Sequence, residues 1–209
     1  MSRDGHLIAI EGANEVGKTT LAHCLAESFL ERGESCRVFA FPGNDAGTLG
    51  SLVKRIHENP PSFDVQDIEP TSLQLLHVAA HIDAIEGRIR PLLKEGTNII
   101  LDRFWWSTLV YGRVSGIDKG VLEEMIDLEQ KYWDGIFPEK VFLIDREVPL
   151  NSDADRDSWD QIRNEYLNFA ESDEHSYPVE IISNDASVEE VVERLRSSVD
   201  SVLGRARST

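Results

Sequence analysis

The chain has 209 residues, of which 41% are hydrophobic and 28% charged, and its formal net charge is −17. This length and composition suit a single globular domain, 1–209, with a buried core. The acidic surplus excludes the basic surface that nucleic-acid binding needs, so no nucleic-acid partner is expected. Cys24 and Cys36 have no metal-ligand spacing, and residues 1–6 lead straight into a strand. We therefore expect a cytoplasmic protein with no signal peptide and no membrane partner.

Short apolar runs alternate with segments of helical periodicity along the chain. Strands are predicted at 7–11, 37–41, 98–101, 141–144 and 179–182, and helices at 18–32, 47–56, 70–94, 105–112, 118–132, 158–171 and 187–203. Pro91 is expected to kink or interrupt the long helix, because proline cannot donate a backbone hydrogen bond. This alternation predicts an α/β fold with a parallel sheet covered on both faces, and ligands at the carboxyl ends of its strands.

The first predicted strand runs directly into the sequence GANEVGKTT at 12–20. It fits the pattern G-x-x-x-x-G-K-[ST] and is followed by a helix, as a phosphate-binding loop requires. Glycines allow the tight turn that points successive N–H groups at an anion, and the helix N-terminus adds its dipole. We expect Lys18 to reach the β- and γ-phosphates of a nucleoside triphosphate, and the Thr19 hydroxyl to bind Mg²⁺. The predicted nucleotide-binding residues are Gly12, Asn14, Glu15, Val16, Gly17, Lys18, Thr19 and Thr20.

Asp102 and Arg103 follow the third predicted strand. At the carboxyl end of that strand the carboxylate would face the phosphate-binding loop, where it can hold Mg²⁺ through water or position an acceptor oxygen. The guanidinium can clamp a phosphate or a transferring phosphoryl group with two parallel hydrogen bonds. The alternative interpretation of the two residues is a surface ion pair.

The long predicted helix carries a polar stripe of Gln74, His77, His81 and Arg88 at helical spacing. Two histidines four residues apart can bind zinc, but a third ligand is missing from that face. The stripe therefore indicates either one wall of a pocket for a polar acceptor or a solvated helix face.

Two further groups of residues are candidates for the site. The aromatic cluster of Phe104, Trp105 and Trp106 beside Arg103 either stacks on a base or packs in the core, and Ser107 and Tyr111 are its polar companions on one helical face. The polar segment 146–158 is a candidate lid whose arginines could screen charge during phosphoryl transfer. Arg146, Arg156 and Arg163 are the candidates, with salt bridges to Asp153, Asp155 and Asp157 as the alternative.

These motifs resemble the thymidylate kinase family of P-loop nucleoside-monophosphate kinases over nearly the whole chain. The resemblance is carried by Ile10-Glu11-Gly12 with Gly17 to Thr20, by Phe41-Pro42-Gly43, by Asp102-Arg103-Phe104 with Ser107 and Tyr111, and by residues 162–167. It implies a five-stranded parallel sheet in the order 2-3-1-4-5 and a homodimer. It also implies γ-phosphoryl transfer from ATP with Mg²⁺ to a nucleoside monophosphate such as dTMP. Lys18, Asp102, Arg103 and Arg156 would be catalytic, and Phe41, Pro42, His77, His81, Arg103, Ser107 and Tyr111 would bind the acceptor.

The chain departs from the family pattern where the acceptor should bind. Ala40 stands where the family has a phosphate-gripping arginine, and His77 and His81 stand where it has a phenylalanine and an arginine against thymine. Asn14 replaces an acidic residue of the phosphate-binding loop. A nucleoside or another small molecule is therefore an alternative acceptor. A non-catalytic nucleotide-binding module is the second alternative, although the chain has no N-K-x-D base-specificity motif.

Overall fold

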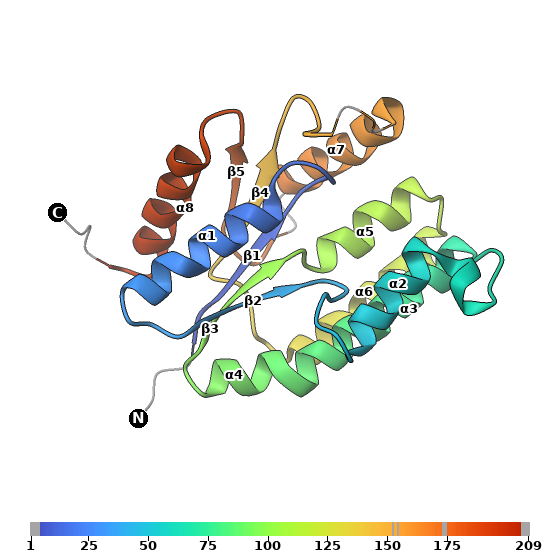
Figure 1. Ribbon diagram of the computed structural model, residues 1–209, viewed down its shortest axis with the longest axis horizontal. Helices are drawn as coiled ribbons and strands as arrows, with labels where there is room; N and C mark the ends of the chain where they lie inside the picture. The colour runs from blue at the N-terminus through green and yellow to red at the C-terminus, as the bar shows by residue number, and fades with distance from the viewer. Residues whose placement is uncertain (1–4, 152, 154, 173–174, 206–209) are drawn as a thin grey trace.

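The computed structural model describes residues 5–151, 153, 155–172 and 175–205. Its centre is a five-stranded parallel sheet in the order β2-β3-β1-β4-β5, which confirms the predicted fold class (Figure 1). The strands are β1 Leu7–Glu11, β2 Cys36–Ala40, β3 Asn98–Asp102, β4 Lys140–Asp145 and β5 Val179–Ser183. In the register of the sheet, Ile10 lies beside Asp102 and Glu11 beside Leu143, so the strands end together. The loops that follow β1, β2 and β3 therefore meet at one edge.

Helices connect the strands and cover both faces of the sheet (Figure 1). They are α1 Lys18–Glu31, α2 Leu49–Glu58, α3 Pro70–Ala84, α4 Arg90–Lys94, α5 Trp105–Val114, α6 Lys119–Trp133, α7 Arg156–Ala170 and α8 Val188–Val202. The predicted long helix is interrupted by a π-helical turn at Ile85–Ile89, immediately before Pro91. This agrees with prediction, since Pro91 has no N–H to offer the carbonyl group one turn earlier. None of the helices within the described residues is long and apolar enough to cross a bilayer.

Two element boundaries differ from prediction in ways that affect the site. Strand β2 ends at Ala40, so Phe41 and Pro42 lie in the loop beyond it, joined by a cis peptide bond. Helix α7 begins at Arg156, two residues before the predicted start, so 156–158 belong to a helix and not to an irregular lid. Two other positions of the predicted lid, 152 and 154, lie outside the described residues.

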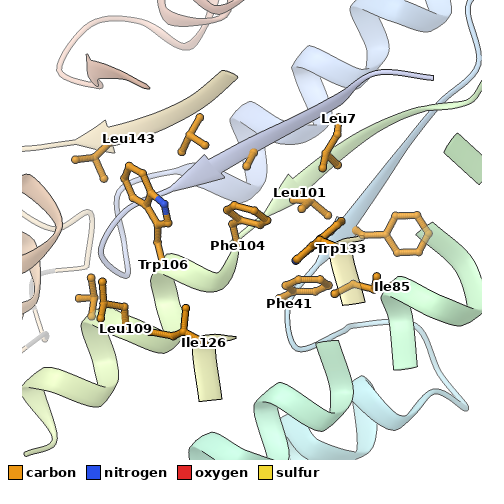
Figure 2. Close-up of a cluster of buried hydrophobic side chains, with 14 of the residues drawn as sticks. Leu7, Phe41, Ile85, Leu101, Phe104, Trp106, Leu109, Ile126, Trp133 and Leu143 are labelled. Carbon is orange, nitrogen blue, oxygen red and sulfur yellow. The ribbon is translucent and has the colours of Figure 1, made fainter. Parts of the chain in front are cut away.

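Alternate residues of the strands fill two cores, one on each face of the sheet. Ile8 and Ile10 of β1 point toward α1 and α8, whereas Leu7 and Ala9 point toward α5 and α6. On this second face Phe104, Trp106 and Trp133 are buried to 3% exposure or less, with Phe41 nearby (Figure 2). Phe104 and Trp106 are therefore core residues. At these two positions the aromatic cluster packs in the core and does not stack on a base.

Candidate active site

A cleft of about 840 Å³ opens at the carboxyl ends of the strands, between the phosphate-binding loop, the loop after β2, and helices α3 and α5. Most of the residues predicted from the sequence line this one cleft. Its lining includes Asn14, Glu15, Gly17, Lys18, Thr19, Thr20, Phe41, Pro42, His77, His81, Asp102, Arg103, Ser107 and Tyr111. Gly12 and Val16 belong to the loop without lining the cleft, and Val16 is buried beneath it.

The conformation of the phosphate-binding loop depends on its two glycines. Gly12 has φ 141°, and a Cβ there would lie 2.4 Å from the Ile144 carbonyl oxygen. Gly17 has φ 91°, and a Cβ there would lie 2.6 Å from Nδ2 of Asn184. That amide nitrogen donates to the Val16 carbonyl at 2.7 Å, so the loop after β5 holds the phosphate-binding loop from outside. Sequence reasoning did not identify Asn184, because nothing near it in the sequence points to the loop.

Lys18 begins α1 and is buried in the floor of the cleft, where its Nζ donates to the Ala13 carbonyl at 2.5 Å. Burial and, to a smaller extent, the nearby positive charge of Arg103 lower the pKa of this ammonium to about 7. Asp102 and Glu11 act in the opposite direction without cancelling the effect. The site therefore holds an amine that a bound polyanion would keep protonated.

Thr19 and Asp102 come together across the sheet edge. The Thr19 hydroxyl donates to Oδ2 of Asp102 at 2.5 Å, and the carboxylate is 5% exposed. A hydroxyl and one carboxylate beside a phosphate site fit Mg²⁺, which takes few protein oxygens and completes its shell with phosphates and water. No cluster of three or more His, Cys, Asp or Glu side chains suited to a metal occurs in the described part of the chain. The zinc alternative for His77 and His81 therefore has no support.

Arg103 joins the two halves of the cleft. Its backbone has φ 81°, an unusual value for a residue with a side chain. One guanidinium nitrogen donates to the Ser107 hydroxyl at 3.0 Å, and the other donates to the side-chain oxygen of Asn14 and to Tyr111 OH at 3.4 Å. These contacts hold a cation between the phosphate-binding loop and the acceptor end of the cleft, where it can serve either phosphate group.

Glu11 fixes this arrangement from below, although sequence reasoning did not list it as a site residue. It is completely buried at the end of β1. Oε1 accepts from the backbone N–H groups of Phe104 and Ser107 at 2.7 and 3.0 Å, and Oε2 accepts from Ser107 Oγ and Tyr166 OH at 2.9 and 3.1 Å. Burial raises the pKa of Glu11, while Arg103 and the donors of Phe104 and Ser107 act against the rise. A carboxylate at the end of an otherwise apolar strand was the available signal for this role.

The acceptor end of the cleft contains the two histidines of α3. The His81 ring stacks on Phe41 with centroids 4.2 Å apart, and its Nδ1 lies 3.0 Å from Oε2 of Glu129 on α6. His77 faces His57, with 3.2 Å between ring nitrogens, and burial lowers its pKa to about 3, with His81, His57 and Arg103 adding to the effect. Two turns before His81, Gln74 lines the same cleft. The polar stripe of α3 is therefore a pocket wall at these three positions.

Four arginines predicted from the sequence do not line the cleft. Arg88 pairs with Asp45, and Arg146 donates to the carbonyl groups of Asn184 and Val148. Arg163 makes a two-pronged salt bridge with Asp145 at 2.6 and 2.7 Å, not with the aspartates named from the sequence. Arg156 pairs with Asp160 one turn on and donates to the Glu147 carbonyl, so its predicted catalytic role stays a prediction.

Comparisons with known proteins agree on one family. A family model described as thymidylate kinase matches residues 10–195. A thymidylate kinase of Legionella pneumophila (strain Corby) is 31% identical over 97% of this chain and 95% of its own length, and one of Dinoroseobacter shibae is 32% identical over 69% of this chain and 66% of its own. The solved thymidylate kinase of Ehrlichia chaffeensis superposes with a TM-score of 0.75 at 22% identity, covering 94% of this chain and 99% of the other. That likeness shows a shared fold.

Proposed function

The chain belongs to the thymidylate kinase family, whose members are phosphotransferases, and from this premise we propose that it transfers the γ-phosphoryl group of ATP to dTMP. The observation that carries the proposal is the convergence of Lys18, Asp102 and Arg103 on one cleft. A phosphate-binding loop on one side of that cleft and a polar pocket on the other suit a donor and an acceptor held in line.

In the proposed reaction an oxygen of the dTMP phosphate attacks the γ-phosphorus of ATP. The bond between the γ-phosphorus and the bridging oxygen breaks, and ADP leaves with that oxygen. The backbone N–H groups of 12–17 and the Lys18 ammonium bind the β- and γ-phosphates, and Arg103 neutralises charge on the transferring group. Mg²⁺, bound by Thr19 and Asp102, would screen the phosphate oxygens. Glu11 holds Arg103 and the start of α5 in place.

The acceptor half of the proposal rests on the residues around Arg103. Ala40 lines the cleft where the family pattern has an arginine, and the lysine and arginine side chains among the lining residues are Lys18, Lys54 and Arg103. Arg103, assisted by Lys54, would therefore bind the acceptor phosphate. Phe41, Pro42, His77, His81, Ser107 and Tyr111 would surround the sugar and base. The alternative acceptor is a nucleoside, which the missing arginine favours because a nucleoside has no phosphate to grip.

An ADP-release assay over several acceptors separates these two functions. We expect dTMP to give the highest kcat/KM among dTMP, dUMP, dCMP, AMP and thymidine. Turnover with thymidine and none with the monophosphates would support the nucleoside alternative. ATP binding without turnover on any acceptor would support a non-catalytic module.

The structure predicts that ATP binding takes up a proton. Without nucleotide Lys18 has a pKa of about 7, so it is mostly neutral at pH 8, and a triphosphate beside it raises that pKa. Binding of a non-hydrolysable ATP analogue should therefore take up about one proton at pH 8 and almost none at pH 6, where the amine is already charged. Calorimetry in two buffers of different ionisation enthalpy measures this uptake. Equal uptake by wild type and Lys18→Ala would contradict the assignment.

Replacing Asp102 by asparagine tests the proposed metal position. The amide keeps the shape and can still accept from Thr19, but it removes the negative charge. The Mg²⁺ concentration for half-maximal activity should rise by about tenfold or more. A magnesium titration at fixed ATP measures it, with Asp127→Asn on the exposed side of α6 as the matched control. An unchanged magnesium requirement would place the metal elsewhere.

We also propose that 1–209 forms one kinase domain located in the cytoplasm and that it pairs as a homodimer. Helices α2, α3 and α6 lie together at one end of the molecule (Figure 1). Their exposed leucines support such an interface: Leu49, Leu52, Leu75 and Leu128.

A further inference from the structure

Each carbonyl group of residues 12–16 in the phosphate-binding loop accepts a hydrogen bond. The donors are Arg103 to Gly12 at 3.4 Å, Lys18 to Ala13 at 2.5 Å, Trp159 to Asn14 at 2.6 Å, the Leu150 N–H to Glu15 at 2.8 Å and Asn184 to Val16 at 2.7 Å. The backbone N–H groups of 13–17, in contrast, donate to none of the described residues. The loop therefore directs its carbonyl groups outward, which leaves its N–H groups for an anion.

Trp159 is the donor that no sequence motif indicated. It lies on α7, 145 residues from Asn14 along the chain, and is 4% exposed. It belongs to the core that also contains Ala13 and Val16, and the guanidinium carbon of Arg156 lies 5.1 Å from the centroid of its ring. The indole is therefore packed in place, and its N–H, the single polar group of this side chain, bonds to the loop.

The hydrogen bond from Trp159 orients the peptide unit between Asn14 and Glu15. In a planar trans peptide the carbonyl group and the N–H group point in opposite directions. Fixing the Asn14 carbonyl group outward therefore fixes the Glu15 N–H toward the inside of the loop. Trp159 is not among the residues that line the cleft, so any effect on a nucleotide passes through this peptide unit.

This peptide unit needs such support because Glu15 is strained. Its φ is 59°, in the left-handed region, which costs a residue with a side chain about 1–2 kcal/mol. Rotation of the peptide unit by half a turn would bring φ of Glu15 into the favoured negative range. The same rotation would turn the N–H away from a bound phosphate and the carbonyl group toward it, where its partial negative charge repels the anion.

Resting on the donor half of the proposed function, we propose that Trp159 is a positioning residue for the phosphates of ATP. Its indole N–H holds the Asn14–Glu15 peptide unit in the strained orientation, so that the Glu15 N–H donates to a phosphate oxygen. Trp159 itself touches no nucleotide. Helix α7 thereby contributes to the donor site through the loop.

Replacing Trp159 by phenylalanine tests this role, because the aromatic ring stays in the core and the N–H is lost. The Kd of a non-hydrolysable ATP analogue with Mg²⁺, measured by calorimetry, should rise about tenfold, the effect of one hydrogen bond. Tripolyphosphate, which has the phosphates without sugar and base, should lose affinity by the same factor. The KM for ATP should rise likewise while kcat with dTMP stays within about twofold, since the loop binds the phosphates in ground state and transition state alike.

Trp106 provides the matched control. It is completely buried in the core on the other face of the sheet, and its Nε1 donates to Tyr177 OH at 2.8 Å. Trp106→Phe therefore removes the same kind of buried hydrogen bond away from the loop. It should lower the thermal unfolding temperature about as much as Trp159→Phe does and leave both Kd values as in wild type.

A measurement on wild type decides if Trp159→Phe does not fold, as its thermal unfolding will show. The indole N–H signals of the protein are assigned by through-bond NMR correlations, and tripolyphosphate is added to saturation. The signal of Trp159 should shift, because the carbonyl group that it contacts belongs to the peptide unit that binds the phosphate. The signal of Trp106 should stay in place.

The possible failures are distinguishable. An unchanged Kd in folded Trp159→Phe, an equal loss of affinity in Trp106→Phe, a loss confined to the ATP analogue, or a Trp159 signal that does not shift overturns the role of Trp159. Failure of wild type to bind the ATP analogue overturns the proposed function itself.

Discussion

Lys18→Ala should lower kcat with ATP and dTMP by about a thousandfold or more, because a preorganised cation at the β- and γ-phosphates acts where charge develops. The ammonium is buried between Ala13, to which it donates, and the Asp102 carboxylate. No other lysine lies in the phosphate-binding loop to replace it. Steady-state kinetics with saturating Mg²⁺ measure the loss.

The variant should remain folded. A buried ammonium whose pKa falls to about 7 opposes folding, so its removal should not lower the thermal unfolding temperature. Lys119→Ala is the control, because that side chain is 86% exposed at the start of α6. Near wild-type turnover by a folded Lys18→Ala protein would show that the loop does not hold the reacting phosphates.

Glu11→Leu should destabilise the protein by about 3–5 kcal/mol, the cost of breaking a buried charged network. Leucine leaves the N–H groups of Phe104 and Ser107 and the hydroxyl of Tyr166 without their acceptor inside the core. It also removes the negative charge opposite Arg103. Denaturant unfolding should show a lower midpoint with an unchanged slope.

A conservative variant separates the charge of Glu11 from its shape, and a surface variant serves as the control. Glu11→Gln can keep an acceptor for the two N–H groups, so it should be milder in stability and yet lower kcat by about tenfold, because Arg103 loses the charge that holds it. Glu123→Leu replaces a side chain of α6 that is 60% exposed, and it should change stability by less than about 0.5 kcal/mol. Wild-type stability in Glu11→Leu would mean that the carboxylate network does not support the site.

The sequence was sufficient to predict the features formed by segments that are adjacent along the chain. Strand β1, the loop 12–20 and helix α1 follow one another along the chain, so their composition and spacing predict them without knowledge of the rest. Asp102 ends β3 and Arg103 follows it. Both residues could be placed opposite that loop, because parallel strands finish at one edge of the sheet. The π-helical turn before Pro91 follows from the missing N–H of proline.

The remaining parts of the site depend on which distant elements meet. Glu129 reaches His81 only because α6 packs on α3, and Asn184 reaches Val16 across 168 residues. The hydrophobic pattern within one segment does not predict contacts with segments that are distant in the sequence. The salt bridge of Arg163 shows the same limit, because its partner Asp145 lies on β4 and not in the polar segment that follows.

Following the γ-phosphoryl group tests the proposed transfer most directly. The protein is incubated with γ-labelled ATP, Mg²⁺ and dTMP, and the nucleotides are separated. We expect label in dTDP in proportion to the ADP formed, and about a thousandfold less label in dTDP when Lys18→Ala replaces the wild type. Label that stays in ATP, or that appears only as free phosphate, would show that the protein does not transfer the γ-phosphoryl group to dTMP.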